Sequence, residues 1–255
     1  MTRLLPRFAV LFMLVSLFAT DSWAAGPGIN LSWTDCGSFG ASNINNLCTS
    51  NGPAPTGTLI TSFISPDSLP ALLGCAGVID ITSSTGLMPS WWDLGPGGCR
   101  DGKISFSADF TLGPFSCVDV WAGLATGGLN YQYPFDSTNY QTLATALAVN
   151  HARVRTLQAV GTPVPVDSLT EYYAFKVTVS KALSTGGGSC AGCLIPMCLV
   201  FNSISLSQPA PTPDVILSTP IAAGSNQVTY QGAGADCNAV PVRQKTWGEI
   251  KSLYR

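Results

Sequence analysis

KISFSADFT, residues 103–111, alternates apolar and polar side chains over its whole length. The even-numbered positions, from Ile104 to Phe110, are apolar, and the odd-numbered positions are polar. Successive side chains of a β-strand point to opposite faces of the sheet. The stretch therefore predicts a strand with one face in a hydrophobic core and the other toward water.

Two later stretches have the same period. Residues 171–181 place aromatic and β-branched side chains at every second position, and residues 198–208 show a weaker form of the pattern. We expect these two strands to pair as antiparallel neighbours. Other short apolar segments are separated by clusters of Gly, Pro, Asn and Ser, which are typical of turns. The sequence therefore predicts an all-β fold, an antiparallel two-sheet β-sandwich of jelly-roll or immunoglobulin-like kind.

The chain divides into three predicted regions. Residues 1–24 combine arginines, an apolar run and small residues at a cleavage point, which indicates a signal peptide, and the run is shorter than the roughly 20 residues needed to cross a bilayer. Residues 25–208 are expected to form the β-sandwich. Residues 209–255 begin with a proline-rich connector and are expected to add a β-hairpin and a short helix that dock on it. We expect a secreted protein, extracellular or at the cell surface, that does not span the membrane.

Charge and acid–base groups are scarce. The 255 residues include 12 basic and 14 acidic side chains and one histidine, with no run of either sign, so nucleic acid is not expected as a partner. A Ser-His-Asp hydrolase site would have to use His151, and the sequence has no G-x-S-x-G motif to supply the nucleophilic serine. Asp93, Asp101, Asp109 and Asp119 could act in glycoside hydrolysis or hold calcium, but aspartates near Gly and Pro are more often turn formers. We therefore predict no catalytic residue, no metal, no cofactor and no enzymatic activity.

Nine cysteines follow the predicted signal peptide, in a compartment where thiols pair. Cys75 lies in an apolar segment and is expected to be the one free thiol. The cysteines expected in disulfides are Cys36, Cys48, Cys99, Cys117, Cys190, Cys193, Cys198 and Cys237. Short spacing would allow Cys36 to pair with Cys48, and Cys99 with Cys117, although spacing alone does not fix connectivity.

GGGSCAGCLIPMC, residues 186–198, has three interpretations. Its cysteines could form disulfides, bind zinc together with Cys237, or act as a redox pair. Pro196 and the strand expected after it disfavour the helix that a redox C-x-x-C motif uses, and a second C-x-x-C arm for zinc is lacking. We favour disulfides that pin this loop to the sheet and to the C-terminal segment.

Aromatic residues give the best binding hypothesis that the sequence offers. Trp91, Trp92 and Asp93 lie in a turn-rich segment, and Tyr131 and Tyr133 in another. Flat rings on a β-sandwich can stack on sugars, as in a carbohydrate-binding module. The alternative is that the two indoles close one end of the sandwich, which we favour because large loop tryptophans are usually buried.

TWGEIKSLYR, residues 246–255, begins with a capping box, and Trp247, Ile250 and Tyr254 would share one face of a short helix. This tail and the CAGC loop resemble those of a group of uncharacterised exported bacterial proteins with a cysteine-bearing β domain. The resemblance implies export and no known activity, and it suggests that the tail serves in docking or sorting. We expect a non-enzymatic, secreted or surface-associated structural or adhesive protein, with a cell-surface protein or polysaccharide as its partner.

Overall fold

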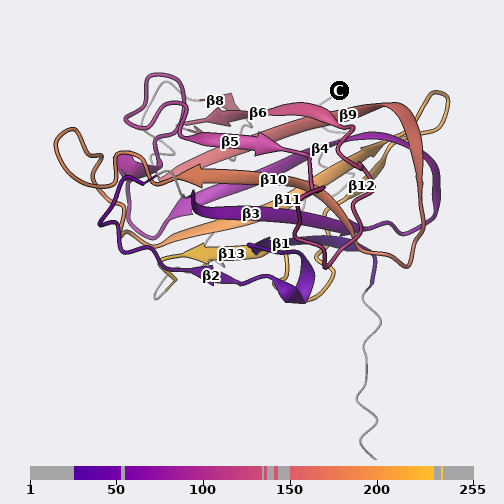
Figure 1. Ribbon diagram of the computed structural model, residues 1–255, viewed down its shortest axis with the longest axis horizontal. Coiled ribbons are helices and arrows are strands. Elements are labelled where there is room, and N and C mark those ends of the chain that lie inside the picture. The colour runs from indigo at the N-terminus through magenta and orange to yellow at the C-terminus, as the bar shows by residue number, and fades with distance from the viewer. Residues whose placement is uncertain are drawn as a thin grey trace, which may run out of the picture.

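The computed structural model describes residues 26–52, 55–133, 135–136, 141–142, 150–232 and 237. These residues form two main β-sheets (Figure 1). The smaller sheet has four antiparallel strands, in the order β1 (Gly28–Trp33), β3 (Pro55–Ile64), β10 (Tyr172–Ser180) and β5 (Ile104–Ser107).

The larger sheet has seven strands and is built around β11 (Met197–Ser207). Its order is β2 (Asn43–Ile44), β13 (Gln227–Tyr230), β11, β4 (Leu69–Ser83), β9 (His151–Val166) and β6 (Thr126–Gln132), with β12 (Val215–Leu217) also paired to β11. Neighbours are antiparallel except β2 and β13. Short β7 (Phe135–Asp136) and β8 (Gln141–Thr142) pair with each other, and two 3₁₀ turns are η1 (Gly37–Phe39) and η2 (Ser90–Trp92).

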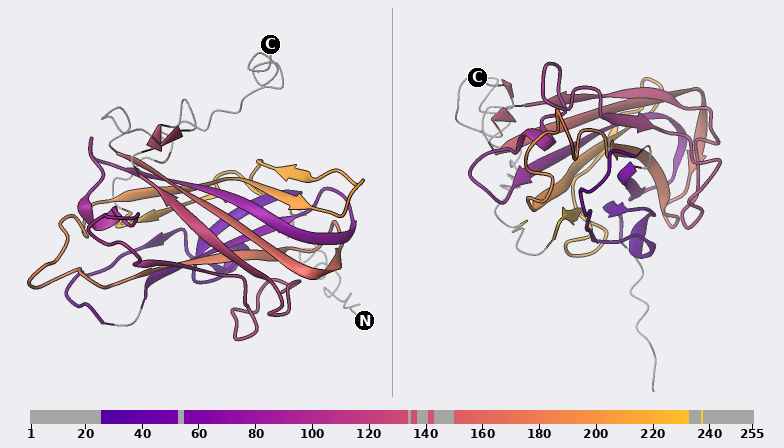
Figure 2. Two further views of the ribbon diagram at one scale, coloured as in Figure 1. Left: turned by 90° about the horizontal axis from the view of Figure 1, so that it is seen from above. Right: turned by 60° about the vertical axis from the view of Figure 1, so that its left-hand side comes forward.

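The two sheets pack face to face and share one hydrophobic core (Figure 2). Phe175 of β10 meets Phe201 of β11 edge to face, with ring centroids 5.7 Å apart. On β9 the residues that face this core are buried, whereas Arg155, Leu157 and Ala159 on the other face are exposed. Apolar alternation therefore produces two layers, as expected.

The expected pairing of residues 171–181 with 198–208 is wrong. These stretches form β10 and β11, which lie in different sheets and face each other through the core. The reason is the connection between them, residues 181–196, which is much longer than the 2–5 residues of a usual hairpin loop. A connection of that length can cross from one layer to the other.

The strand predicted over residues 103–111 is shorter than the alternating stretch of sequence. β5 ends at Ser107, and Asp109 then accepts a hydrogen bond from the Thr111 N–H at 2.9 Å, which turns the chain. Phe110 is still buried, but it stacks on the ring of Tyr173 with centroids 4.3 Å apart instead of continuing the strand. An aspartate that caps its own turn outweighs the alternation here.

The hairpin expected after residue 209 does not form from β12 and β13, since both strands pair with β11. The chain between them runs along the edge of β1 instead: the Ile29 N–H donates to the Thr219 carbonyl, and the Leu31 N–H to the Ser225 carbonyl, at 2.9 and 2.8 Å. The predicted signal peptide and C-terminal helix lie outside the described residues. Within the described part of the chain, no helix is long and apolar enough to cross a membrane.

Candidate functional site

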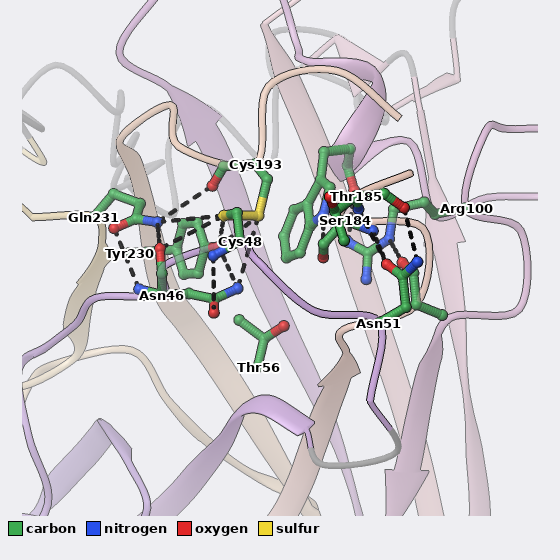
Figure 3. Close-up of a disulfide and its surroundings, with 12 residues drawn as sticks. Asn46, Cys48, Asn51, Thr56, Arg100, Ser184, Thr185, Cys193, Tyr230 and Gln231 are labelled. Carbon is green, nitrogen blue, oxygen red and sulfur yellow. Dashed lines mark hydrogen bonds between the residues drawn. A yellow bond between two sulfur atoms is a disulfide. The ribbon is translucent and has the colours of Figure 1, made fainter. Parts of the chain in front are cut away.

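The connection between β10 and β11 is crosslinked at one end of the molecule. Cys193 is bonded to Cys48, and Cys190 to Cys99, so two other loops are tied to the segment that joins the two sheets. Figure 3 shows the first of these disulfides with its surroundings. Two of the four disulfides meet in this one connection, which makes this end the candidate site.

The structure pairs the same eight cysteines that the sequence assigns to disulfides and leaves Cys75 as a buried free thiol. The two local pairings are wrong, because Cys36 bonds to Cys117 and Cys99 to Cys190. Strand pairing brings these distant partners together: Val118, next to Cys117, forms a bridge with Tyr172 of β10.

The zinc interpretation of the CAGC loop is also wrong. Its cysteines lie in three separate disulfides, and Cys198 is bonded to Cys237. Thiols in disulfides are not available as thiolate ligands. Among the residues that the structure describes, no group of three His, Cys, Asp or Glu side chains is placed to hold a metal ion.

Trp91 and Trp92 close this end of the core. Both are 0% exposed, and Trp91 stacks on Tyr230 with ring centroids 5.4 Å apart and planes at 16°. The Trp91 indole N–H donates to the Ser184 hydroxyl at 3.0 Å. A ring without exposed surface cannot stack on a sugar, so these tryptophans fit the plug and not the carbohydrate platform.

Of the other three residues predicted for the binding platform, only Tyr131 is buried with the plug. Tyr131 is buried, and its hydroxyl donates to the Trp92 carbonyl. Tyr133 and Asp93 are half-buried beside it. Burial raises the pKa of Asp93, and the nearby Asp101 carboxylate raises it further.

Arg100 is the residue of this site that the sequence did not reveal. It is fully buried, and its guanidinium donates to the carbonyls of Trp91 (2.8 Å), Ala182 (3.0 Å) and Ser180. Its central carbon lies 3.6 Å from the centroid of a Trp91 ring. Burial lowers the pKa of Arg100 to about 10, which leaves a cation at neutral pH. One side chain thus joins the η2 turn to the end of β10 and to the crosslinked connection.

The Cys48–Cys193 disulfide lies in a polar setting (Figure 3). The Tyr230 hydroxyl is 3.4 Å from the Cys193 sulfur, and the Gln231 amide donates to the Cys193 carbonyl at 3.3 Å. On the other side, Asn51 accepts from the N–H groups at 184 and 185, at 2.8 and 3.0 Å. These contacts fix the backbone on both sides of the disulfide.

In the fold, His151 lies beside the carboxylate of Asp80, a residue far from it in the sequence. Asp80 of β4 lies 3.5 Å from its Nε2, and the same carboxylate accepts two hydrogen bonds from Arg153, at 2.5 and 2.7 Å, and one from Asn202 at 2.6 Å. Burial would raise the pKa of Asp80, but hydrogen bonds from Arg153 and His151 outweigh it and lower the pKa. Asp80 and Arg153 are 2% and 5% exposed. The carboxylate is therefore committed to holding three strands together.

Neither the family models, nor the curated proteins, nor the solved structures contain a match to this chain. Its function has to be argued from its own geometry.

Proposed function

We propose that this chain is a non-enzymatic, secreted or surface-associated protein with a structural or adhesive role, stabilised by its disulfides. The observation that carries the proposal is the crosslinked end. Disulfides at Cys190 and Cys193 tie the connection between the sheets to two further loops, and an aromatic plug fills the space beneath them. Such crosslinks suit a protein that has to keep its shape outside the cell, where thiols are oxidised.

The finer features of the proposal concern fold type and origin. We infer a jelly-roll or immunoglobulin-like sandwich, which the face-to-face sheets of antiparallel strands support. The CAGC loop at residues 190–193 and the tail at 246–255 resemble those of exported bacterial proteins, which supports a bacterial, extracellular origin. A partner at the cell surface, protein or polysaccharide, fits the adhesive role.

Export is tested by producing the full chain in a bacterium and probing intact cells with antibodies raised against the oxidised protein. We expect label on intact cells or protein in the medium, with the disulfides formed and residues 1–24 removed, as read by intact mass. Protein confined to the cytoplasm with reduced cysteines would contradict the proposal.

Adhesion is tested by coating beads with the mature protein and measuring their retention under flow on bacterial cells. We expect stronger retention than for albumin-coated beads, and we expect the double variant Cys48→Ala/Cys193→Ala to reduce it. The variant Cys75→Ala is the control, since this thiol takes no part in a disulfide. Retention equal to that of albumin, together with no effect of protein loss on the cell envelope, would refute a structural or adhesive role.

A further inference from the structure

A cavity of about 850 Å³ lies against β1, and none of its lining residues belongs to the crosslinked end. Its walls are the loop around η1 on one side and residues 219–225 on the other. Pockets for small organic ligands have volumes of roughly 300–1,000 Å³, so the cavity has the size of a ligand site.

Glu171 is the one ionisable side chain among the described residues that line this cavity. Its Oε1 accepts a hydrogen bond from the Ser62 hydroxyl at 2.6 Å. No hydrogen bond from the described residues reaches Oε2, and the ion pairs of the described chain do not involve Glu171. The residue is only half exposed, so water compensates its charge incompletely.

Gly37 keeps the second carboxylate oxygen accessible. A Cβ at position 37 would lie 2.7 Å from Glu171 Oε2, and the backbone there has φ +55°, which side chains rarely adopt. Glycine at this position therefore leaves space beside the carboxylate that any other residue would fill.

The charges around Glu171 favour an incoming cation. Burial raises its pKa, the Ser62 hydrogen bond lowers it, and the Asp35 carboxylate raises it again. Asp35 is itself satisfied, since it accepts from the Tyr173 hydroxyl at 2.8 Å and from the Cys36 N–H at 2.7 Å. A cation that contacts Glu171 would thus relieve both its desolvation and the repulsion from Asp35.

The apolar residues of the wall are Leu31, Pro220, Ile221, Ala222 and Ala223. Apart from Glu171, the other lining residues are glycines or carry hydroxyl or amide groups. Aromatic rings, which recognise quaternary ammonium groups, are not among the described residues that line it. A primary ammonium, with three N–H donors and a small radius, suits a carboxylate beside hydroxyl groups better.

We propose that this cavity binds a small organic amine, whose protonated amino group pairs with the Glu171 carboxylate and whose short apolar body lies against residues 219–223. The proposal goes beyond a structural or adhesive role and does not depend on it, because the cavity is separate from the crosslinked end.

Calorimetric titration of the mature protein with n-hexylammonium chloride tests the proposal. We expect a dissociation constant of about 1 mM or below, and at least about tenfold weaker binding of 1-hexanol, which has the same apolar body without the charge. Glu171→Gln should weaken hexylammonium binding at least about tenfold. The matched control is Asp67→Asn, which removes an exposed carboxylate and changes the net charge equally.

Ala222→Trp provides a second variant that leaves Glu171 intact and reduces the cavity, and it should also weaken binding. Circular dichroism and the urea midpoint identify any variant that fails to fold. The proposal is overturned if the folded protein does not bind hexylammonium, if hexanol binds equally well, or if folded Glu171→Gln and Ala222→Trp proteins bind as the original does.

Discussion

Replacing Arg100 by lysine should destabilise the protein strongly although the charge is kept. The guanidinium reaches three backbone carbonyls in different directions and covers the Trp91 ring. A lysine ammonium is a compact group at the end of a flexible stem, and it cannot reproduce that fork. We therefore expect at least two of the three hydrogen bonds to be lost, although the Ser180 carbonyl still accepts from the Thr56 hydroxyl at 3.1 Å.

The magnitude follows from those bonds. A hydrogen bond from a charged donor contributes about 1.5–3 kcal/mol, and each buried carbonyl left without a donor costs about 1–3 kcal/mol. Two lost bonds, partly offset by local rearrangement, give a loss of about 3 kcal/mol in the free energy of unfolding for Arg100→Lys. In a domain of this size, that loss corresponds to a fall of about 6–12 °C in Tm.

Urea denaturation followed by tryptophan fluorescence, with the disulfides intact, measures the effect. Arg155→Lys on the exposed face of β9 is the matched control and should change stability by less than about 0.5 kcal/mol. Arg100→Met, which supplies no donor at all, should be less stable than Arg100→Lys. If Arg100→Lys behaves like the control, or if methionine is the more stable replacement, the carbonyl contacts of Arg100 do not hold this end together.

Three further predictions concern the Cys75 thiol, the Cys48–Cys193 disulfide and the Asp80 carboxylate. Burial raises the pKa of the Cys75 thiol. Iodoacetamide at about pH 8 should therefore leave this thiol unmodified in the folded protein and alkylate it in urea, which intact mass measures. Rapid alkylation of the native protein would contradict the burial of Cys75. Removing the Cys48–Cys193 disulfide, which links residues 145 apart, should cost about 3–5 kcal/mol in urea unfolding, and a loss below about 1 kcal/mol would show that the polar contacts suffice. Folding lowers the pKa of Asp80. The ionised carboxylate therefore stabilises the folded protein fully above the unfolded-state pKa of about 3.9, and this stabilisation is lost as the pH falls through the lower pKa of the folded state. Asp80→Asn should cost about 3–5 kcal/mol near pH 7, since the charge of Arg153 is left unpaired, and much less near pH 2; an equal cost at both pH values would refute the ion-pair account.

Apolar alternation in the sequence predicts where strands form. It does not predict which strands pair with each other. Residues 171–181 contain the whole of β10, because every second side chain there is large and apolar. Which strand lies beside β10 depends on pairing with β3 and β5, whose residues are far away along the chain. An apolar face can be buried against a strand of the same sheet or of the opposite sheet, and the pattern does not distinguish the two.

The candidate site was predictable only where residue type alone determines burial. Two adjacent tryptophans in a turn-rich segment favour a plug, and Trp91 and Trp92 form one. Arg100 could not be assigned, because its partners are backbone carbonyls, which carry no sequence signal. The Asp80 contacts with His151 and Arg153 depend on the register of β4 against β9, which the sequence does not give.

The placement of the disulfides explains why a β-rich chain with long loops needs them. Strands hold each other through ladder hydrogen bonds, which most of the connections between strands lack. Seven of the eight bonded cysteines lie outside the strands. The connection from β10 to β11 contains Gly186, Gly187 and Gly188, and glycine loses more backbone conformational entropy on folding than any other residue type. Two disulfides follow within this same connection, at Cys190 and Cys193. Both crosslinks therefore restrain a glycine-rich connection that strand pairing does not hold, and their loss should loosen this end before it separates the sheets.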